Sequence, residues 1–369
     1  MLAAVLVLIY IVLIALLIIG FDRLPYFVAQ KQEAQTAFTV IVPFRNEEKN
    51  LPSLLKSIQE LNYPEHLVEF ILVDDESTDA SAAIIKSFGS SNLKSIQNKR
   101  VSASPKKDAI SVAISEAKYP WIITTDADCI LPKNWLVTFD QYLSKNECEM
   151  LVAPVTYESS QSFLNQFQLL DFLSLQGATI GGFGWKKPFL CNGANLVYKK
   201  KTFKQLNGFE GNNTMASGDD FFLMERFLNK DKKSVHYVKS KEVMVKTRAV
   251  DSISKLINQR VRWAAKSSNY NLLEAKIVGL IVLLGNLSLM ALPFLSWQNL
   301  ISWELSSLLF LGKCFIDAML LHKTEKLMEQ NTPVLSTFLS CFIYPIFSSF
   351  VALRATFGTY RWKDRVFKK

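Results

Sequence analysis

Histidine and cysteine are scarce in this sequence, and their spacing excludes several kinds of site. Three histidines are spread over 369 residues. This spacing offers neither the ligands of a His-ligated zinc site nor the base of a histidine-activated nucleophile. The five cysteines are odd in number and include no C-x-x-C pair, which favours reduced thiols in a cytosol-facing protein over a disulfide framework. Zinc-finger spacings and RNA-binding signatures are absent as well. Nucleic acid is therefore the least expected partner of this chain, whose net charge of +9 fits an anionic membrane surface or a phosphorylated substrate better.

Charged residues are also scarce in four long stretches. Leu2 to Ile19 contains none, and at about 1.5 Å per residue it is long enough to cross a hydrocarbon core of about 30 Å. No basic region precedes it and no cleavage site follows it, so we expect a retained anchor over residues 1–20 rather than a removed signal peptide. Three further stretches are expected to be membrane segments rather than buried soluble helices. They are Ile277–Leu295, Leu300–Leu321 and Val334–Leu353, within residues 277–354, and a basic tail follows at residues 355–369.

The polar block between these stretches alternates predicted strands and helices. Ala37–Pro43 is rich in β-branched residues and precedes a helical pattern, and Phe70–Val73 repeats this arrangement. A further helix at Lys107–Ala117 leads into a strand at Trp121–Thr125. Successive β-α units predict an α/β domain with a mostly parallel sheet, covered on both faces, that binds ligands at the carboxyl ends of its strands.

Acidic residues follow two of these strands. Asp74 and Asp75 follow the second strand, and Asp126 and Asp128 follow the strand at Trp121–Thr125. Residues i and i+2 of an extended chain point to the same side, so Asp126 and Asp128 would converge and require a cation. We expect the two acidic segments to lie side by side at one edge of the sheet, where oxygen ligands suit Mg²⁺ or Mn²⁺ holding a phosphorylated ligand. Taken alone, Asp-Ala-Asp is more typical of a solvated turn.

Five short motifs in a fixed order are more specific than any one of them. They are VIVPFRNEEKNL (residues 40–51), ILVDDESTD (71–79), TTDADC (124–129), SGDDFFL (217–223) and QRVRW (259–263). This set resembles the family 2 inverting glycosyltransferases, and in particular the membrane-anchored branch that includes cellulose synthase, hyaluronan synthase and ceramide glucosyltransferase. The resemblance extends from about Phe38 to Trp263. It implies a GT-A, Rossmann-like domain over residues 37–250 and an interface helix region over 251–275.

The resemblance also assigns roles to residues at the nucleotide end of the site. Asp75, with Asp74 beside it, would face the uracil or ribose. Asp128 would bind the metal that bridges the diphosphate, and Asp126 would support both ribose and metal. The loop residues implied in nucleotide binding are Pro43, Glu47 and Lys106. The lysine loop departs from the family's GKxxALN, because Pro105 replaces glycine and Ser111 replaces asparagine.

At the acceptor end, Asp220 would be the general base, with Asp219 as its neighbour. The QxxRW residues would neutralise the leaving diphosphate and pack by the acceptor; they are Gln259, Arg260, Arg262 and Trp263. Gly193 and Ala194 match an acceptor-side strand.

Each of these motifs also has a purely structural interpretation. SGDD is typical of a helix N-terminus with favourable acids. QRVRW fits an amphipathic helix lying on a membrane. The Gly193–Ala194 pair is equally consistent with packing, and the glycines of Gly181–Trp185 are typical of a mobile gate or an ordinary loop.

These patterns predict an integral protein of the plasma (inner) membrane with a cytosolic catalytic domain. We expect hexosyl or N-acetylhexosaminyl transfer from a nucleotide-sugar donor, with UDP favoured by the resemblance and GDP open, to a lipid or lipid-linked acceptor. One anchor and three later segments are too few to enclose a polymer channel. Three alternatives remain: a processive polysaccharide synthase subunit, a catalytically degenerate nucleotide-sugar-binding scaffold, and a transporter. The last is disfavoured because the membrane segments contain few ionisable residues beyond Lys313 and Asp317.

Overall fold

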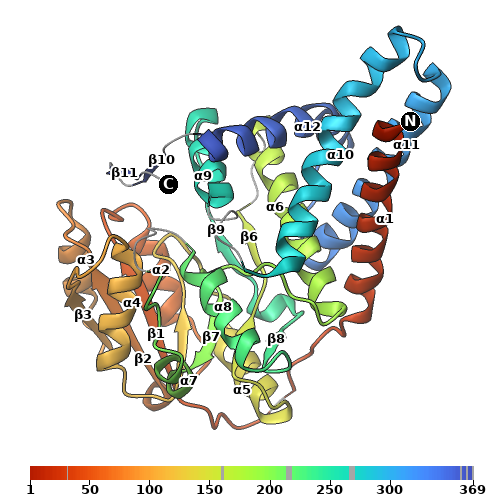
Figure 1. The fold of residues 1–369 in the computed structure, drawn as a ribbon. Coiled ribbons are helices and arrows are strands. Elements are labelled where there is room, and N and C mark those ends of the chain that lie inside the picture. The colour runs from red at the N-terminus through yellow and green to blue at the C-terminus, as the bar shows by residue number, and fades with distance from the viewer. Residues whose placement is uncertain are drawn as a thin grey trace. The chain divides into compact units, whose positions relative to one another are not determined.

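The chain forms two compact units (Figure 1). The computed structural model describes residues 1–30, 32–158, 162–212, 218–265, 271–357, 360–362 and 365–367. The sheet unit consists of Pro25–Glu158 and Cys191–Arg248. The helical unit consists of Met1–Leu24, Ser159–Leu190 and Ala249–Lys369. Ser217, residues 266–270 of the predicted interface region and part of the predicted basic tail lie outside the described residues.

The sheet unit is built on a seven-stranded sheet in the order β3-β2-β1-β4-β7-β5-β8. Strands β3, β2, β1 and β4 are parallel, and β7 runs antiparallel to both of its neighbours. The predicted α/β class with a mostly parallel sheet is therefore confirmed. The strands of this sheet are β1 (Phe38–Phe44), β2 (Val68–Asp74), β3 (Leu93–Gln97), β4 (Trp121–Thr124), β5 (Met150–Val152), β7 (Leu196–Lys199) and β8 (Val235–Tyr237), and β6 (Val155–Tyr157) pairs separately with β9 (Val245–Thr247).

Helices connect these strands in the expected β-α alternation. Helix α4 packs on β1 and β2, which are buried along nearly their whole length. Strands covered on both faces need continuous apolar runs, and this is why FTVIVPF and VEFILVD are so uniformly hydrophobic. The helices are α2 (Leu51–Gln59), α3 (Ser81–Phe88), α4 (Pro105–Glu116), α5 (Trp135–Lys145), α7 (Lys200–Gln205) and α8 (Asp219–Lys230), with short 3₁₀ turns at Glu65–Leu67 and Lys241–Val243.

The strand order corrects one expectation. The acidic segments after β2 and β4 were predicted to lie side by side, but β1 lies between these two strands. That prediction is wrong because it followed the order of strands along the chain, and the order in the sheet is different. The carboxyl ends of β2, β1 and β4 still share one edge of the sheet, since the three strands are parallel.

A buried asparagine fixes the segment that leads into β7. Asn195 is fully buried and accepts a hydrogen bond from Trp135 Nε1 at 3.0 Å. Its Nδ2 donates to the carbonyl oxygens of Pro154 at 2.8 Å and Val243 at 2.7 Å. A buried amide with its partners satisfied locks local geometry. The backbone immediately before Asn195, which includes Gly193, is thereby held in place.

The helical unit contains four helices long and apolar enough to cross a membrane, counted over the described residues: Leu2–Arg23, Leu273–Trp297, Trp303–Leu327 and Val334–Thr356. They coincide with the four stretches predicted from the sequence. The unit's elements are α1 (Leu2–Arg23), α6 (Phe163–Gly184), α9 (Ile253–Ala265), α10 (Leu273–Trp297), α11 (Trp303–Leu327) and α12 (Val334–Phe357), and a small hairpin of β10 (Tyr360–Trp362) and β11 (Arg365–Phe367).

Helix α6 packs closely against α1 through glycines. A Cβ atom on Gly184 would lie 1.8 Å from the carbonyl oxygen of Gly20, and one on Gly181 would lie 2.5 Å from that of Leu17. The prediction that Gly181–Trp185 is a gate or loop is wrong, because residues up to Gly184 belong to α6. Glycine is needed here for the approach of two helix backbones, not for a flexible turn.

A buried ion pair joins polar groups among the long helices. Lys313, with a side chain only 2% exposed, lies 2.8 Å from Asp317 within α11. The hydroxyl of Tyr10 on α1 donates to Asp317 at 2.9 Å. The Lys313 ammonium also lies over the rings of Tyr10 at 5.3 Å and Tyr344 at 5.6 Å. The pair therefore fixes how α1, α11 and α12 meet.

We expect Lys313→Met to destabilise the helical unit by about 3–5 kcal/mol, because it leaves the Asp317 carboxylate without its buried counter-ion. The measurement is thermal unfolding of the detergent-solubilised protein. Lys323→Met is the matched control, since the Lys323–Asp22 pair has side chains 32% and 57% exposed and should contribute at most about 1 kcal/mol. Equal stability of the Lys313→Met variant and the wild type would refute the importance of the pair.

Candidate active site

The Asp126–Cys129 segment forms a turn after β4. The strand ends at Thr124, and the N–H of Cys129 donates to the carbonyl oxygen of Asp126 at 3.2 Å. The extended conformation predicted for Asp126–Asp128 is therefore wrong; a tight turn, rather than strand alternation, presents the two acids. Burial raises the pKa of the Cys129 thiol well above its usual range, and the carboxylates of Asp128 and Asp126 raise it further. Both acids thus lie within electrostatic range of one buried thiol.

Lys106 connects this turn to helix α8. It stands in the first turn of α4, which begins with Pro105, a residue well suited to that position. Its ammonium lies 2.7 Å from Asp126 Oδ1 and 3.3 Å from Asp219 Oδ2. Burial alone would lower the pKa of Lys106, but the carboxylates of Asp126, Asp219 and Asp220 outweigh it and raise that pKa above its ordinary value. Lys106 therefore stays charged throughout the physiological pH range.

The first turn of α8 holds the other two acids of the site. Gly218 caps the helix in a left-handed conformation with φ +83°. Asp220 accepts hydrogen bonds from the N–H of Phe221 at 2.7 Å and from the N–H of Gly193 at 3.2 Å. Carboxylates are favoured at this end of a helix. The helix-terminus interpretation of SGDD and a fixed orientation for Asp220 are thus both consistent with the structure.

Gly193 lies directly against this cluster. A Cβ atom built on it would stand 3.1 Å from Asp219 Oδ2, 3.3 Å from Asp220 Cβ and 3.6 Å from Lys106 Nζ. Ala194 beside it is buried, and its N–H donates to Asn192 Oδ1 at 3.0 Å. The absence of a side chain at residue 193 therefore leaves space next to the acids and the lysine.

We expect Gly193→Ala to lower kcat by about tenfold, because Asp219 and Asp220 must shift by a few tenths of an ångström and catalysis is sensitive to such displacement. Steady-state kinetics with the best donor is the measurement. Gly279→Ala is the control, since an added Cβ there meets no atom within 4 Å. Wild-type kcat in the Gly193→Ala variant would show that this contact does not matter.

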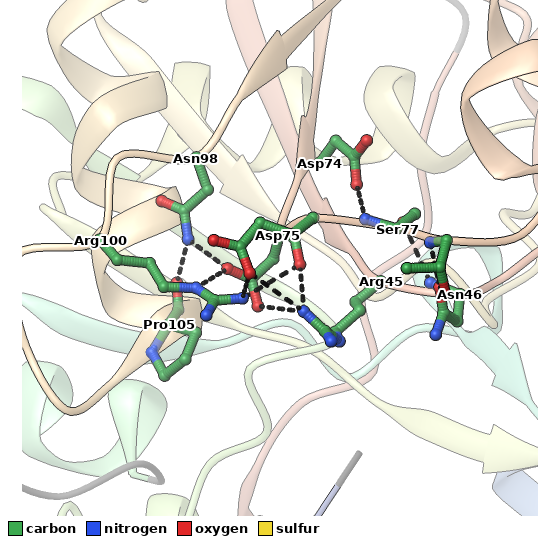
Figure 2. A network of polar contacts seen from close by, with 10 residues as sticks. Arg45, Asn46, Asp74, Asp75, Ser77, Asn98, Arg100 and Pro105 are labelled. Carbon is green, nitrogen blue, oxygen red and sulfur yellow. Dashed lines mark hydrogen bonds and ion pairs between the residues drawn. The ribbon is translucent and has the colours of Figure 1, made fainter. Parts of the chain in front are cut away.

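At the predicted nucleotide end, Asp75 is contacted by two arginines (Figure 2). Its Oδ1 accepts hydrogen bonds from Asn98 Nδ2 and Arg100 Nε, both at 2.7 Å. Arg45 Nη1 donates to the Asp75 carbonyl oxygen at 2.8 Å. Glu76 follows with φ +60° and pairs with Arg100 at 2.7 Å. A non-glycine residue rarely adopts this φ, and the ion pair with Arg100 helps to hold it.

The loop after β1 is tied to the segment after β2. Asp74 Oδ1 accepts a hydrogen bond from the N–H of Ser77 at 2.8 Å. The N–H of Glu47 donates to Ser81 Oγ at 2.8 Å, and its carboxylate accepts from Asn50 Nδ2 at 2.7 Å. Pro43 lies within β1, opposite Val73 of β2. The predicted nucleoside residues therefore gather at the carboxyl ends of two adjacent strands.

Asn98 links this nucleotide end to the lysine. Its Nδ2 also donates to the carbonyl oxygen of Pro105 at 3.1 Å, next to Lys106. A continuous series of contacts thus runs from Asp75 through Asn98 and Pro105 to Lys106, and from Lys106 to the two acidic turns. The structure brings eleven of the predicted site residues into one unit: Pro43, Glu47, Asp74, Asp75, Lys106, Asp126, Asp128, Gly193, Ala194, Asp219 and Asp220.

The QRVRW residues lie on α9 in the helical unit. Arg260 Nε is 2.5 Å from Asp171 Oδ2 on α6, and both side chains are buried. The Arg260 guanidinium also stacks over Trp263, with its carbon 4.2 Å from the ring centre. Arg260 is thus neutralised within its own unit, while Gln259 and Arg262 are partly exposed. The roles of Gln259, Arg260, Arg262 and Trp263 toward the diphosphate and acceptor stay predictions.

Four residues of the site were missed from the sequence, and one of them is Arg45, which lies in the motif of residues 40–51 but was given no role there. Asn98 and Arg100 follow β3, a strand whose polar residues gave no clear strand pattern. Tyr198 on β7 is fully buried, and its hydroxyl makes no hydrogen bond within the described part of the chain. Burial raises the pKa of Tyr198 and the Asp219 carboxylate raises it further, while Lys106 lowers it. Tyr198 therefore lies within electrostatic range of the Lys106–Asp219 pair.

Comparison with known proteins agrees with this geometry. Residues 39–230 match the sequence profile of glycosyl transferase family 2. The chain belongs to this family. Its structure is similar to that of a mannosyltransferase from Pyrobaculum calidifontis, solved with GDP-Man and Mn²⁺, with a TM-score of 0.60. The two sequences are 16% identical, and the match covers 93% of this chain and 99% of that one. That likeness confirms the predicted GT-A fold.

Curated relatives match shorter parts of the glycosyltransferase. It is 30% identical over 116 residues to the poly(ribitol-phosphate) β-N-acetylglucosaminyltransferase TarS of Staphylococcus aureus, covering 31% of this chain and 20% of TarS. It is 44% identical over 62 residues to a 4,4'-diaponeurosporenoate glycosyltransferase of Staphylococcus haemolyticus, covering 16% of each. It is 23% identical over 158 residues to a poly-β-1,6-N-acetyl-D-glucosamine synthase of Staphylococcus epidermidis, covering 42% of this chain and 37% of the synthase. The chain thus spans well under half the length of each.

The acidic turn has the chemistry of a divalent metal site. No group of three or more His, Cys, Asp or Glu side chains within the described ranges is arranged to hold a metal by itself. Asp126 and Asp128 nevertheless offer carboxylate oxygens, and the Lys106 ammonium at 2.7 Å shows that a cation fits against Asp126. Mg²⁺ and Mn²⁺ sites of this kind use one or two carboxylates and complete their shell with phosphate and water oxygens. The residues present therefore fit a metal that arrives with a diphosphate.

Proposed function

We propose that this family 2 glycosyltransferase is a membrane-bound inverting enzyme that transfers a sugar from a nucleotide-diphosphate donor to a hydroxyl group of a lipid or lipid-linked acceptor. The observation that carries the proposal is the position of Lys106. Lys106 contacts both Asp126, on the turn after β4, and Asp219, the neighbour of Asp220. A donor diphosphate at the turn after β4 and an acceptor hydroxyl at α8 would therefore lie within one site.

The chemistry follows from the order of these groups. The acceptor oxygen attacks the anomeric carbon, a new carbon–oxygen bond forms, and the bond to the diphosphate breaks. Asp220, oriented by the N–H groups of Gly193 and Phe221, takes the acceptor proton. General-base help of this kind is worth about 10²–10⁴-fold. Asp126 and Asp128 would hold Mg²⁺ or Mn²⁺, which supplies positive charge to the leaving diphosphate when bound.

Asp75 and its partners would hold the nucleoside. The Asp75 carboxylate is fixed by Asn98 and Arg100, and both arginines beside it remain partly exposed. The Asp75 carboxylate can accept a hydrogen bond from a base N–H, and the guanidinium groups beside it can donate to the carbonyl oxygens of the base. We assign a UDP-sugar as the preferred donor on family resemblance and a GDP-sugar as the alternative, with hexosyl or N-acetylhexosaminyl transfer in either case.

The acceptor and the location follow from the helical unit. Four candidate membrane helices in the described part of the chain support an integral protein of the plasma (inner) membrane, with the catalytic residues on its cytosolic side. One anchor and three later helices are few for a polymer channel, so a single transfer to a lipid or lipid-linked hydroxyl fits better than processive synthesis. The basic chain is not proposed to bind nucleic acid.

The test is to identify the product. Detergent-purified protein is incubated with Mn²⁺, a membrane lipid extract and a panel of radiolabelled UDP- and GDP-sugars, and the label is separated into organic, polymeric and free fractions. Label from one donor in the organic phase, lost in Asp128→Ala, is the expected result. Long polymer from purified protein and a single donor would replace the single-transfer proposal with a processive synthase. Nucleotide binding without any transfer would leave a catalytically degenerate scaffold.

A further inference from the structure

A cation already lies in the acidic cluster. The Lys106 ammonium contacts Asp126 Oδ1 at 2.7 Å and Asp219 Oδ2 at 3.3 Å. The Lys106 and Asp219 side chains are 18% and 13% exposed, so water shields this contact only weakly. One oxygen of Asp126, which together with Asp128 is proposed to hold the metal, is therefore already paired with a lysine.

A divalent ion and the Lys106 ammonium compete for Asp126, whose Oδ1 already contacts the lysine. Two positive charges against one carboxylate repel each other, and this repulsion weakens the binding of the second cation. Metal binding at the turn after β4 is thus stronger when Lys106 moves off Asp126. The Lys106 ammonium can move toward Asp219, which already contacts it, because Gly193 has no side chain and leaves space beside Nζ.

We propose that Lys106 is an exchangeable counter-ion of the metal site. It neutralises Asp126 while no donor is bound, and it gives up this carboxylate when the metal arrives together with a nucleotide diphosphate. The inference rests on the proposed donor and metal. It adds that the protein binds the metal weakly on its own and strongly with nucleotide, because the free metal must displace Lys106 with fewer oxygen ligands to compensate.

The exchange also accounts for the form of the site. Lys106 keeps one partner, Asp219, when it leaves Asp126, so its charge is never stranded in a partly buried position. Asp220 lies next to Asp219 and also acts electrostatically on Lys106. Donor binding would therefore move the Lys106 ammonium from Asp126 to the acids of α8. The positive charge beside Asp219 and Asp220 would increase only when a donor is present.

The test is Mn²⁺ binding to the detergent-purified full chain, read from the electron paramagnetic resonance signal of free Mn²⁺, with and without UDP or GDP. Lys106→Met is expected to bind Mn²⁺ at least about tenfold more tightly than wild type in the absence of nucleotide, and nucleotide should then improve its Mn²⁺ affinity much less. Lys106→Arg keeps the charge and should stay as weak as wild type. Lys94→Met is the matched control, because Lys94 pairs with Glu116 at 3.6 Å with side chains 41% and 53% exposed, and it should bind Mn²⁺ as wild type does.

Mn²⁺ affinity in Lys106→Met that equals or falls below the wild-type value would overturn the proposal. Thermal unfolding checks that the variant is folded, and Lys106→Gln replaces it if it is not. The readout does not depend on turnover, so the two proposals can fail separately. A gain in Mn²⁺ affinity in Lys106→Met without any sugar transfer by the wild type would support the exchange of Lys106 and refute the transferase mechanism. Sugar transfer by the wild type without that gain would support the transferase mechanism and refute the exchange.

Discussion

Replacing Asp220 with asparagine should lower kcat by about 10²–10⁴-fold while donor affinity stays within a few-fold of wild type. The amide has the size of the carboxylate and can still accept a hydrogen bond from Phe221 or Gly193, which contact Asp220 at 2.7 and 3.2 Å. It cannot take the acceptor proton. The loss should therefore appear in the chemical step, and not in binding of the nucleotide sugar.

A comparison with the neighbouring acid separates this role from a structural one. Asp219→Asn removes only the 3.3 Å ion pair with Lys106 and keeps the proposed base, so it should lower kcat less than Asp220→Asn. A variant at residue 220 with kcat within tenfold of wild type would remove Asp220 from the mechanism.

Replacing Asp128 with alanine should abolish metal-dependent transfer, with a loss of at least about 10³-fold, because the proposed metal would contribute several kcal/mol of charge stabilisation to the leaving diphosphate. Asp128 and Asp126 lie together on the turn after β4, and both act on the buried thiol of Cys129. Lys106 stays on Asp126 in this variant, so the protein should fold normally. Donor titration with and without EDTA, alongside the rate, measures the effect.

The control for this change is a carboxylate outside the site. Asp251→Ala removes an exposed acid that pairs with Lys255 on the protein surface, and it should leave the rate and the metal dependence unchanged. If the Asp128→Ala variant kept full activity that EDTA still abolished, the metal would have to bind elsewhere in the chain.

Much of the fold could be predicted because its central strands are buried on both faces. Burial on both faces explains the apolar runs of β1 and β2. A length and composition suited to crossing a membrane explain the four long apolar helices. Strand β3 was missed because LKSIQ, at the edge of the sheet, mixes polar and apolar residues and is only partly buried. The glycines at the end of α6 were misinterpreted because close helix packing and a flexible loop favour the same residue.

The residue types of the site were predictable, but their contacts were not. Asp126 and Lys106 are 20 residues apart and Asp171 and Arg260 are 89 apart, and nothing local in the sequence pairs them. The family resemblance pointed to Asp126, Lys106 and Asp219 separately. Only the folded chain shows the lysine between the two acids, and Tyr198 carries no signal beyond its place in a strand.

Nucleotide release by the detergent-purified protein tests the central claim most directly. A panel of UDP- and GDP-sugars is supplied with a membrane lipid extract, first with EDTA and then with Mn²⁺ restored, for wild type, Asp128→Ala and Asp220→Asn. We expect release from one class of donor that stops with EDTA, returns with Mn²⁺ and is lost in both variants. A rate of nucleotide release that EDTA does not change would contradict metal-assisted transfer. Release that persists in Asp220→Asn would contradict Asp220 as the base.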